Sequence, residues 1–320
     1  MPRVLILTDG KAGHENQSKA FARALGCEFD LVGVRFRSRF AKALSYPADR
    51  LGLGLERLFA VDAPVGGGYV AVLGTGSGTF YAVKTLARRL GARCGVVLYP
   101  RGYRLTTFDC ILAPSFDRPA KRQNVVEIPA NLVANDESFY SQGIADFCER
   151  SGEPVGSPAV AVIVGGPNKC STMTPEWMRS ELSRVFAENG HPRFAQASAT
   201  SRAVPRFWVT TSRRTPPEVE AVVDSFPFDY RLLYSRDHFN PIPAFVGLAS
   251  RLYVTAESTG MLSEACTFGR AEVRALDNLR PGPHKFRTFV DDLRREGYVD
   301  GTRKVDLAAP FSRAKALLGV

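Results

Sequence analysis

The 320-residue chain has no paired cysteines, no histidine cluster and no long apolar run. Its six cysteines form no C-x-x-C pair, and none lies near a histidine at zinc-site spacing. We therefore expect free, mostly buried thiols in a reducing compartment. The absence of about 18 consecutive apolar residues argues against a spanning helix. The apolar part of residues 1–9 is too short for a signal peptide and predicts a first strand, so we expect a cytoplasmic protein, with peripheral attachment to the inner face of a membrane left open.

Composition is that of a globular protein, with 45% hydrophobic and 23% charged residues. The net charge of +10 favours an anionic partner, which could be a phosphate, a nucleic acid or an anionic membrane surface. Nucleic acid is the weakest of these, because the basic residues do not interleave with stacking aromatics as single-strand binders require. The sequence does not indicate an oligomeric state.

Short apolar runs rich in β-branched residues alternate with helix-period stretches, the pattern of βαβ units. In the first half we expect strands at 3–8, 31–34, 69–73, 94–98, 110–113 and 125–128, and helices at 14–25, 40–59 and 80–90. In the second half we expect strands at 159–164, 207–211, 231–234, 252–255 and 272–274, and helices at 175–188, 217–223, 241–248, 258–268 and 285–296. Turn formers at 151–158 predict a linker, and the Ala/Ser-rich stretch 195–203 predicts a surface loop.

This pattern predicts an α/β fold with two Rossmann-like domains, residues 1–154 and 155–320, whose parallel sheets face each other across a cleft. The last helix could pack back on the first domain. Ligands of open parallel sheets bind beyond the carboxyl ends of the strands. The loops that follow the strands are therefore where the binding residues are expected.

The first such loop, at residues 9–17, opens a helix whose free N–H groups suit an anion. It is no Walker A loop, because the upstream glycine and the Ser/Thr after Gly-Lys are missing. His14, or Asp9 beside it, is the candidate general base. The alternative is that His14 and Gln17 only cap and decorate the helix. The acceptor and phosphate candidates in this loop are Lys11, Gly13 and Gln17.

A second glycine-rich loop follows the strand at 69–73 and nearly matches a dinucleotide fingerprint. That reading needs an acidic residue at the end of the next strand for the ribose, and residues 98–101 contain none. NAD is therefore not expected. The loop still suits a phosphate or a sugar hydroxyl. Its candidate residues are Gly74, Thr75, Gly76 and Ser77.

Three loops in the second half combine glycine, hydroxyl and basic residues. Arginine pairs beside hydroxyl donors suit a diphosphate, although a basic turn in solvent is the alternative. Glu264 lies among apolar neighbours and needs a partner, for which a ribose is the candidate. Ser258 or Thr259 is expected to cap the helix at 258–268. The donor-binding candidates are Gly165, Gly166, Lys169, Ser212, Arg213, Arg214, Thr215, Glu257, Ser258, Thr259, Gly260, Met261 and Glu264.

Five ordered motifs, DGKxGHExQ, GTGSxT, GGPxK, TTSRRTPPE and ESxxMxxEA, span nearly the whole chain. Together they resemble the mitochondrial-fission "elongated mitochondria" family of plants and its bacterial relatives. The resemblance implies a GT-B fold and glycosyltransferase activity. By a looser similarity to lipid-linked glycosyltransferases, it implies that Glu264 binds ribose hydroxyls and that Gly13 and His14 meet the acceptor and donor phosphates. The sequence departs from that pattern after Lys169, where Cys170-Ser171-Thr172 replaces the expected aromatic or basic residue.

Residues 35–44 interleave arginines with large apolar side chains, and leucines follow at 51, 53, 55 and 58. This pattern is compatible with an interfacial helix on a membrane that carries a lipid-linked acceptor. The favoured alternative is an ordinary amphipathic helix whose apolar face packs on the sheet.

These features favour a glycosyltransferase that takes its sugar from a nucleoside-diphosphate sugar and passes it to an acceptor held by the first domain, a lipid-linked or envelope molecule being the candidate class. No Asp-x-Asp pair occurs, so we expect neither a metal nor a cofactor, with arginines, Lys169 and helix N-termini stabilising the leaving diphosphate. One alternative is a non-catalytic scaffold that recruits a partner to a membrane. Another is a sugar-nucleotide epimerase, for which we identify no acid/base pair.

Overall fold

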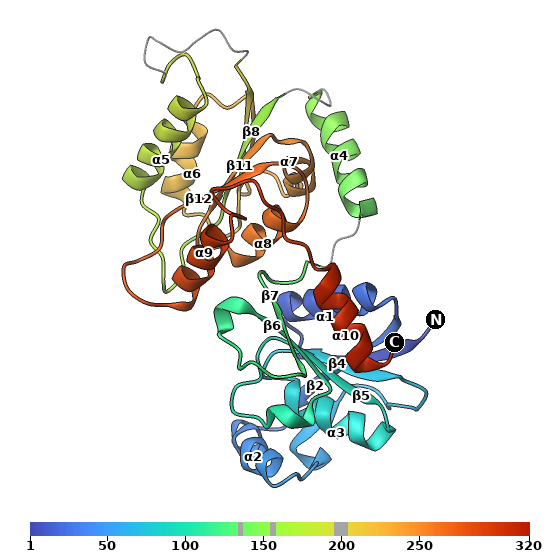
Figure 1. Cartoon of the computed structure of the whole chain (residues 1–320). Coiled ribbons are helices and arrows are strands. Elements are labelled where there is room, and N and C mark those ends of the chain that lie inside the picture. Colours follow the sequence, from blue (N-terminus) through green and yellow to red (C-terminus); the bar gives the residue numbers. More distant parts are fainter. Residues whose placement is uncertain (134–136, 154–157, 195–203) are drawn as a thin grey trace. The chain divides into compact units, whose positions relative to one another are not determined.

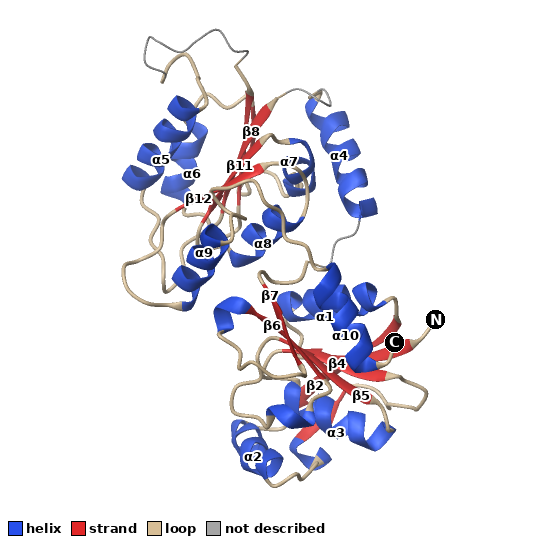
Figure 2. Ribbon diagram, in the orientation of Figure 1, coloured by secondary structure: helices blue, strands red, loops and turns tan. Residues whose placement is uncertain are grey.

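A computed structural model describes residues 1–133, 137–153, 158–194 and 204–320. The chain forms two units, each with its own sheet (Figure 1). Unit 1 comprises Met1–Ala134 and Asp306–Val320, and unit 2 comprises Asn135–Val305. Helices cover the sheet in each unit (Figure 2).

Unit 1 is built on a seven-stranded sheet of order β3-β2-β1-β4-β5-β6-β7, in which only the β2–β3 pair is antiparallel. Side chains of a strand point alternately to the two faces. Accordingly, Val4 and Ile6 join one core cluster with α1 and α10, while Leu5 and Leu7 join another with α3. The strands are β1 (Arg3–Thr8), β2 (Glu28–Phe36), β3 (Phe59–Val61), β4 (Ala71–Thr75), β5 (Arg93–Val97), β6 (Cys110–Pro114) and β7 (Val125–Ile128). The helices are α1 (Ala12–Leu25), α2 (Arg39–Arg50), α3 (Phe80–Leu90) and α10 (Ala308–Leu318), with short 3-10 turns η1 (Glu56–Leu58), η2 (Leu105–Thr107) and η3 (Ser115–Asp117).

Unit 2 is built on a five-stranded parallel sheet of order β10-β9-β8-β11-β12. Its central strand β8 is buried along its whole length, as expected for the middle of a parallel sheet. The strands are β8 (Ala159–Val164), β9 (Arg206–Thr211), β10 (Tyr230–Leu232), β11 (Arg251–Thr255) and β12 (Glu272–Leu276). The helices are α4 (Glu137–Ser151), α5 (Pro175–Glu188), α6 (Pro217–Asp224), α7 (Ile242–Leu248), α8 (Thr259–Thr267) and α9 (Lys285–Arg295).

The structure confirms the predicted fold class of two Rossmann-like domains, and it corrects three details. The helix predicted at 40–59 is divided into α2 and η1 and gives way to the strand β3 at Phe59. The helix α4 was not predicted, and it packs against α7. The units therefore divide near residue 134, not at 154, while the last helix α10 contacts α1 and β7 of unit 1. The predicted linker at 151–158 lies partly outside the described residues, and the predicted loop at 195–203 lies wholly outside them.

Both sheets have a topological switch point, where successive connections leave a central strand in opposite directions. In unit 1 this point lies between β1 and β4, and in unit 2 it lies between β8 and β11. Loops that follow such a pair of strands form the usual ligand crevice of open α/β sheets. The predicted motif DGKxGHExQ follows β1, and GTGSxT begins with the last two residues of β4. The motifs GGPxK and ESxxMxxEA follow β8 and β11.

The cysteines agree with the expectation of free thiols. All six are free, and the four at positions 27, 94, 110 and 266 are buried. Within the described ranges, no helix combines the length and apolar character that crossing a bilayer requires.

Candidate functional site

In unit 1, Asp9 and His14 form a pair at the start of α1. The Nδ1 atom of His14 lies 3.0 Å and 3.1 Å from the two carboxylate oxygens of Asp9. Burial alone would raise the pKa of Asp9, but hydrogen bonds from Lys11 and His14 hold that pKa below its usual value. The carboxylate is thus ionised at neutral pH and can only accept, so Nδ1 of His14 carries the proton and donates. In neutral His14 the other ring nitrogen, Nε2, is left as an acceptor.

The glycine loop after β4 packs directly on this pair. A Cβ atom on Gly76 would lie 2.4 Å from Cε1 of His14, and one on Gly78 would lie 2.7 Å from Oδ2 of Asp9. The φ angle of Gly76 is +84°, a conformation that other residues seldom adopt. Glycine is therefore required at position 76 for two reasons, and the loop fixes the imidazole ring from one side.

The other unit 1 candidates have different surroundings. Lys11 lies 3.2 Å from Asp9, and Thr75 shares a buried hydrogen bond of 2.6 Å with Ser18. Ser77 accepts a hydrogen bond of 3.0 Å from Lys42 of α2. Gln17 has a buried Oε1 atom with no hydrogen-bond partner in the described part of the chain. No side chain caps the amino end of α1, so His14 does not serve as a helix cap.

The candidates Gly13 and Gly74 differ in how closely their neighbours pack. A Cβ atom on Gly13 would meet nothing within 4 Å, whereas one on Gly74 would lie 2.7 Å from Val83 and 2.8 Å from Thr79. Gly74 therefore allows α3 to approach β4 closely, while Gly13 leaves open space at the first turn of α1.

In unit 2, a buried network crosses the switch point beneath the Gly165–Gly166 turn. The Gly165 N–H donates to Oγ1 of Thr255 over 2.8 Å, and that hydroxyl donates to Glu257 over 3.0 Å. Asn278 donates to the other Glu257 oxygen over 2.7 Å. A Cβ on Gly165 would lie 2.1 Å from Glu257, so the network needs a glycine there. The loops after β8 and β11 are thus joined by buried hydrogen bonds.

Glu257 is 2% exposed, and burial raises its pKa even though Asn278 and Thr255 hydrogen-bond to its carboxylate. Asn278 was not among the predicted residues. It lies two residues after β12, whose carboxyl end adjoins that of β11, so its place after a strand was the available signal. Its Oδ1 atom is buried and has no partner among the described residues.

The Ser212–Thr215 turn after β9 packs on the same glycines. Thr215 donates to the Gly165 carbonyl over 2.6 Å and accepts the Ser212 N–H over 2.9 Å. A Cβ on Gly166 would lie 2.3 Å from the Arg214 carbonyl oxygen. The backbone of this turn is therefore fixed, although the side chain of Arg214 is exposed.

Three cations project from these two loops, and the structure gives them no ion pair within the described ranges. They are all exposed, which keeps them available to an anion. Because both loops follow strands at the same edge of the sheet and touch each other through Gly165 and Gly166, their cations belong to one region. The three are Lys169, Arg213 and Arg214.

At α8 the structure changes two expectations. Neither Ser258 nor Thr259 caps the helix, because Ser258 occupies the N-cap position with a φ/ψ of −94°/80°, outside the extended geometry that directs a cap side chain to the first turn. Glu264 has its partner within the unit, since the hydroxyl of Tyr140 in α4 donates to it over 2.8 Å. Gly260 and Met261 lie in the first turn of α8.

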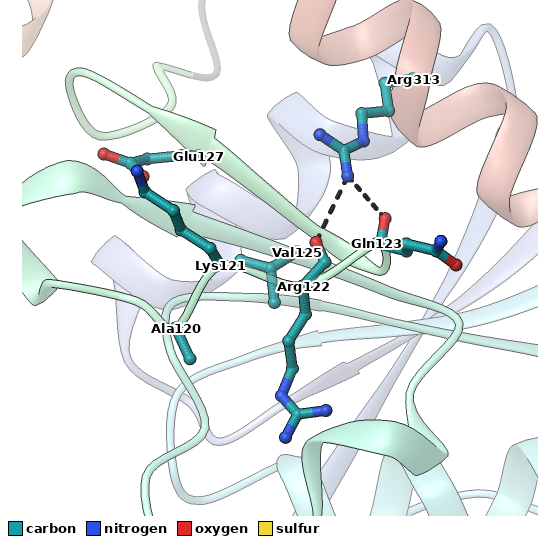
Figure 3. A pocket seen from close by; sticks show the side chains of 7 residues that line it. All are labelled: Ala120, Lys121, Arg122, Gln123, Val125, Glu127 and Arg313. Carbon is teal, nitrogen blue, oxygen red and sulfur yellow. Dashed lines mark hydrogen bonds between the residues drawn. The ribbon is translucent and has the colours of Figure 1, made fainter.

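A cavity of about 540 Å³ lies elsewhere in unit 1 (Figure 3). It adjoins the amino end of β7, so it is at the opposite edge of the sheet from the strand-end loops. Arg313 of α10 closes one side by donating to the carbonyls of Arg122 and Gln123 (Figure 3). None of the predicted site residues lines it; the lining residues are Ala120, Lys121, Arg122, Gln123, Val125, Glu127 and Arg313.

The described residues contain no group of three or more His, Cys, Asp or Glu side chains placed to hold a metal ion. At the strand-end loops, the groups capable of binding an anion are guanidinium, ammonium and backbone N–H groups.

Comparison with known proteins bears on the fold and on the family of the chain. The structure is similar to UDP-GlcNAc 2-epimerase from Neisseria meningitidis bound to UDP-GlcNAc, with a TM-score of 0.51, 10% identity and full coverage of both chains. That similarity is evidence for the fold alone. A more distant similarity is to ADP-heptose LPS heptosyltransferase II of E. coli, with a TM-score of 0.46, 10% identity, and 99% and 98% of the two chains covered. No curated protein matches the sequence. The family profile described as "Mitochondrial fission ELM1" matches residues 12–312, so the chain belongs to that family.

Proposed function

We propose that the chain is a glycosyltransferase that takes a sugar from a nucleoside-diphosphate sugar without a metal ion. The observation that carries the proposal is the switch point of unit 2. There Lys169, Arg213 and Arg214, which have no ion pair among the residues that the structure describes, project from two loops that contact each other through Gly165 and Gly166. A diphosphate site needs both elements: a backbone that the phosphates can approach closely, and cations that neutralise the negative charge of the nucleoside diphosphate when it leaves the sugar.

The donor would bind mainly to unit 2. Its diphosphate would contact the three cations and the turn at Ser212 and Thr215, and the first turn of α8, with Thr259, Gly260 and Met261, would offer N–H groups. Glu257 would hold the loops in place from beneath, since it is buried and bonded to Asn278. The ribose role of Glu264 remains a prediction, and Tyr140 would orient its carboxylate for that role.

The acceptor would bind to unit 1, where His14 acts as the base. Asp9 keeps the proton on Nδ1, and the free Nε2 can then take the proton of an acceptor hydroxyl as it attacks the sugar carbon. The nucleoside diphosphate leaves with the bonding electrons, and the cations of unit 2 stabilise it. This is the chemistry of an inverting transfer. We also propose that the acceptor is membrane-borne and that the protein works at a cytoplasmic membrane face.

The test is a melting-temperature screen against UDP, GDP, ADP, CMP and their sugars. A nucleoside diphosphate should stabilise the wild type by mass action. Arg213→Gln/Arg214→Gln should weaken the binding by about tenfold to hundredfold per arginine, because hydrogen bonds to charged groups contribute about 1.5–3 kcal/mol each. Arg193→Gln/Arg270→Gln removes the same charge from exposed positions of unit 2 and should leave binding intact. If none of the nucleotides raises the melting temperature, the proposal is wrong.

A second candidate is a non-catalytic scaffold that recruits a partner to a membrane, and the family's description by mitochondrial fission favours it. Substitution of two residues separates the candidates. His14→Ala and Glu264→Gln should abolish or strongly lower sugar turnover in a transferase. A scaffold would retain partner recruitment in both variants and would show no turnover in the wild type.

A further inference from the structure

The helix α2 of unit 1 presents its large apolar side chains to solvent. Phe40, Leu44, Pro47 and Leu51 recur at intervals of four, three and four residues and so lie along one helix face. Phe40 is 87% exposed and Leu51 is 75% exposed. Leu53, in the loop that follows, is 48% exposed. The helix was expected to pack this face on the sheet, and the structure shows the reverse.

The face that α2 does bury combines small and polar residues with one aromatic ring, Tyr46, which stacks on Tyr103 with the ring centroids 4.6 Å apart. Ala48 joins the core cluster, and Ser45 bonds to the hydroxyl of Tyr103 over 2.9 Å. Asp49 forms a buried ion pair with Lys84 of α3. The helix is therefore anchored by these specific contacts, and the stripe of Phe40, Leu44 and Leu51 lies outside the core cluster. Large apolar side chains exposed next to one another along a helix indicate a contact outside the chain.

The surroundings of the stripe are strongly basic. Within residues 35–57 the acidic side chains are Asp49 and Glu56, and each is neutralised, by Lys84 and by Arg89 respectively. The exposed arginines have no ion pair within the residues that the structure describes. They are Arg35, Arg37, Arg39, Arg50 and Arg57.

We propose that this α2 surface, made of Arg37, Arg39, Phe40, Leu44, Arg50, Leu51 and Leu53, docks on an anionic lipid bilayer. A helix with aromatic and leucine side chains on one face and arginines at its borders has the chemistry of an interfacial helix, with the apolar face in the acyl boundary and the cations at the head groups. Unpaired arginines favour a lipid surface over a protein partner, because a protein face would need matching acids placed at each of them.

Docking here would bring the bilayer close to the candidate acceptor loop. Lys42 of α2 donates to Ser77 over 3.0 Å, and Gly76 beside it packs on His14. An acceptor carried on a lipid could then reach the loop without leaving the membrane. This consequence rests on the proposed function, whereas the docking itself does not.

The test is co-sedimentation of the full chain with phosphatidylcholine vesicles, with and without phosphatidylglycerol. The wild type should bind the anionic vesicles, and the binding should weaken as salt is added. Arg37→Gln/Arg39→Gln/Arg50→Gln should lower the affinity about fivefold per charge, roughly a hundredfold together. Phe40→Ser/Leu44→Ser should lower it by roughly tenfold or more.

A matched control removes the same charge elsewhere. Arg179→Gln/Arg193→Gln/Arg270→Gln changes three exposed arginines of unit 2 and should bind vesicles much like the wild type. Equal loss in this control, or no preference for anionic vesicles in the wild type, would overturn the proposal. So would a doubled mass by light scattering that Phe40→Ser/Leu44→Ser abolishes, since the surface would then join two copies. Nucleotide binding is measured on the same variants, so that failure of docking is distinguished from failure of the proposed function.

Discussion

Replacing Asp49 tests whether α2 is held by its buried ion pair. The side chains of Asp49 and Lys84 are each 6% exposed, and Asp49 also accepts the backbone N–H of Arg104 over 2.7 Å. Lys84 reaches the Arg104 carbonyl over 3.2 Å and lies over the ring of Phe108. Burial lowers the pKa of Lys84, and Asp49 opposes that shift, so the lysine depends on the carboxylate for its charge.

The expected cost of Asp49→Ala follows from these contacts. Removing one member of a buried ion pair costs about 3–5 kcal/mol, because the other charge is left uncompensated. The Arg104 N–H also loses its acceptor, which adds about 1 kcal/mol or more. With a urea m-value of about 2 kcal/mol/M, the unfolding midpoint of unit 1 should fall by roughly 2 M.

The assay uses the placement of the tryptophans. Trp177 and Trp208 are the two in the chain, and both lie in unit 2, so their fluorescence reports that unit while far-UV circular dichroism reports both. Asp49→Ala should shift the dichroism transition and leave the fluorescence transition in place. Glu56→Ala is the control, because it removes an ion pair at the surface. Glu56 and Arg89 lie 2.7 Å apart, and their side chains are 43% and 42% exposed.

That exposed pair should contribute less than about 1 kcal/mol. The reasoning is refuted if Asp49→Ala shifts the midpoint no further than Glu56→Ala does. Asp49→Asn gives an intermediate test, since an amide can still accept the Arg104 N–H but leaves Lys84 without its counter-charge. A loss between those of the two alanine variants is expected.

Three further results are expected. The pKa of Glu257 in the folded state lies above its unfolded value of about 4.5, so the stability that its protonated form contributes is lost as pH rises through the folded pKa. From about pH 4.5 upward, the melting temperature of Glu257→Gln should therefore rise relative to that of the wild type. A difference between the two melting temperatures that does not vary with pH would contradict this. Gly76→Ala should cost about 1 kcal/mol or more through its positive φ and its clash with His14, and His14→Ala should relieve part of the loss in a double-mutant cycle of melting experiments. In the native chain a thiol reagent should label the half-buried Cys148 and Cys170 and reach the other four only on unfolding; fast labelling of more than two thiols would contradict the burial.

The fold could be predicted where local pattern and burial agree. The strand β8 is six consecutive apolar residues between Pro158 and Gly165, so a fully buried central strand was the simple interpretation. The helix α5 has Thr174 as a cap and Pro175 at its first position, and both signals are local. By contrast β3 has three residues, too short for a period, and α4 buries only Tyr140 and Phe147 among its described side chains.

The candidate site could be predicted to the extent that it depends on which residues follow a strand. Loops that follow strands meet at one edge of a parallel sheet, so Asp9, Gly76 and Gly165 were identified from their positions alone. The contacts that complete the site could not be identified in this way. Tyr140 reaches Glu264 from 124 residues away, and Asn278 reaches Glu257 from a different strand end. The place of Asn278 just after β12 puts it at the same sheet edge, but nothing in the local sequence indicates that it contacts Glu257, and Tyr140 has no signal of either kind.

The orientation of α2 was predicted wrongly for a physical reason. A period near 3.6 residues shows that a helix has two unlike faces, but it does not show which of them the core accepts. At α2 the partner on α3 is Lys84, and a buried lysine requires the carboxylate of Asp49. Once Asp49 points inward, the geometry of the helix directs Phe40 and Leu44 outward. An apolar stripe in water contributes nothing to folding, and polar residues there would serve the isolated chain better. The stripe is therefore better explained by a contact of the folded protein with another apolar phase than by the stability of unit 1.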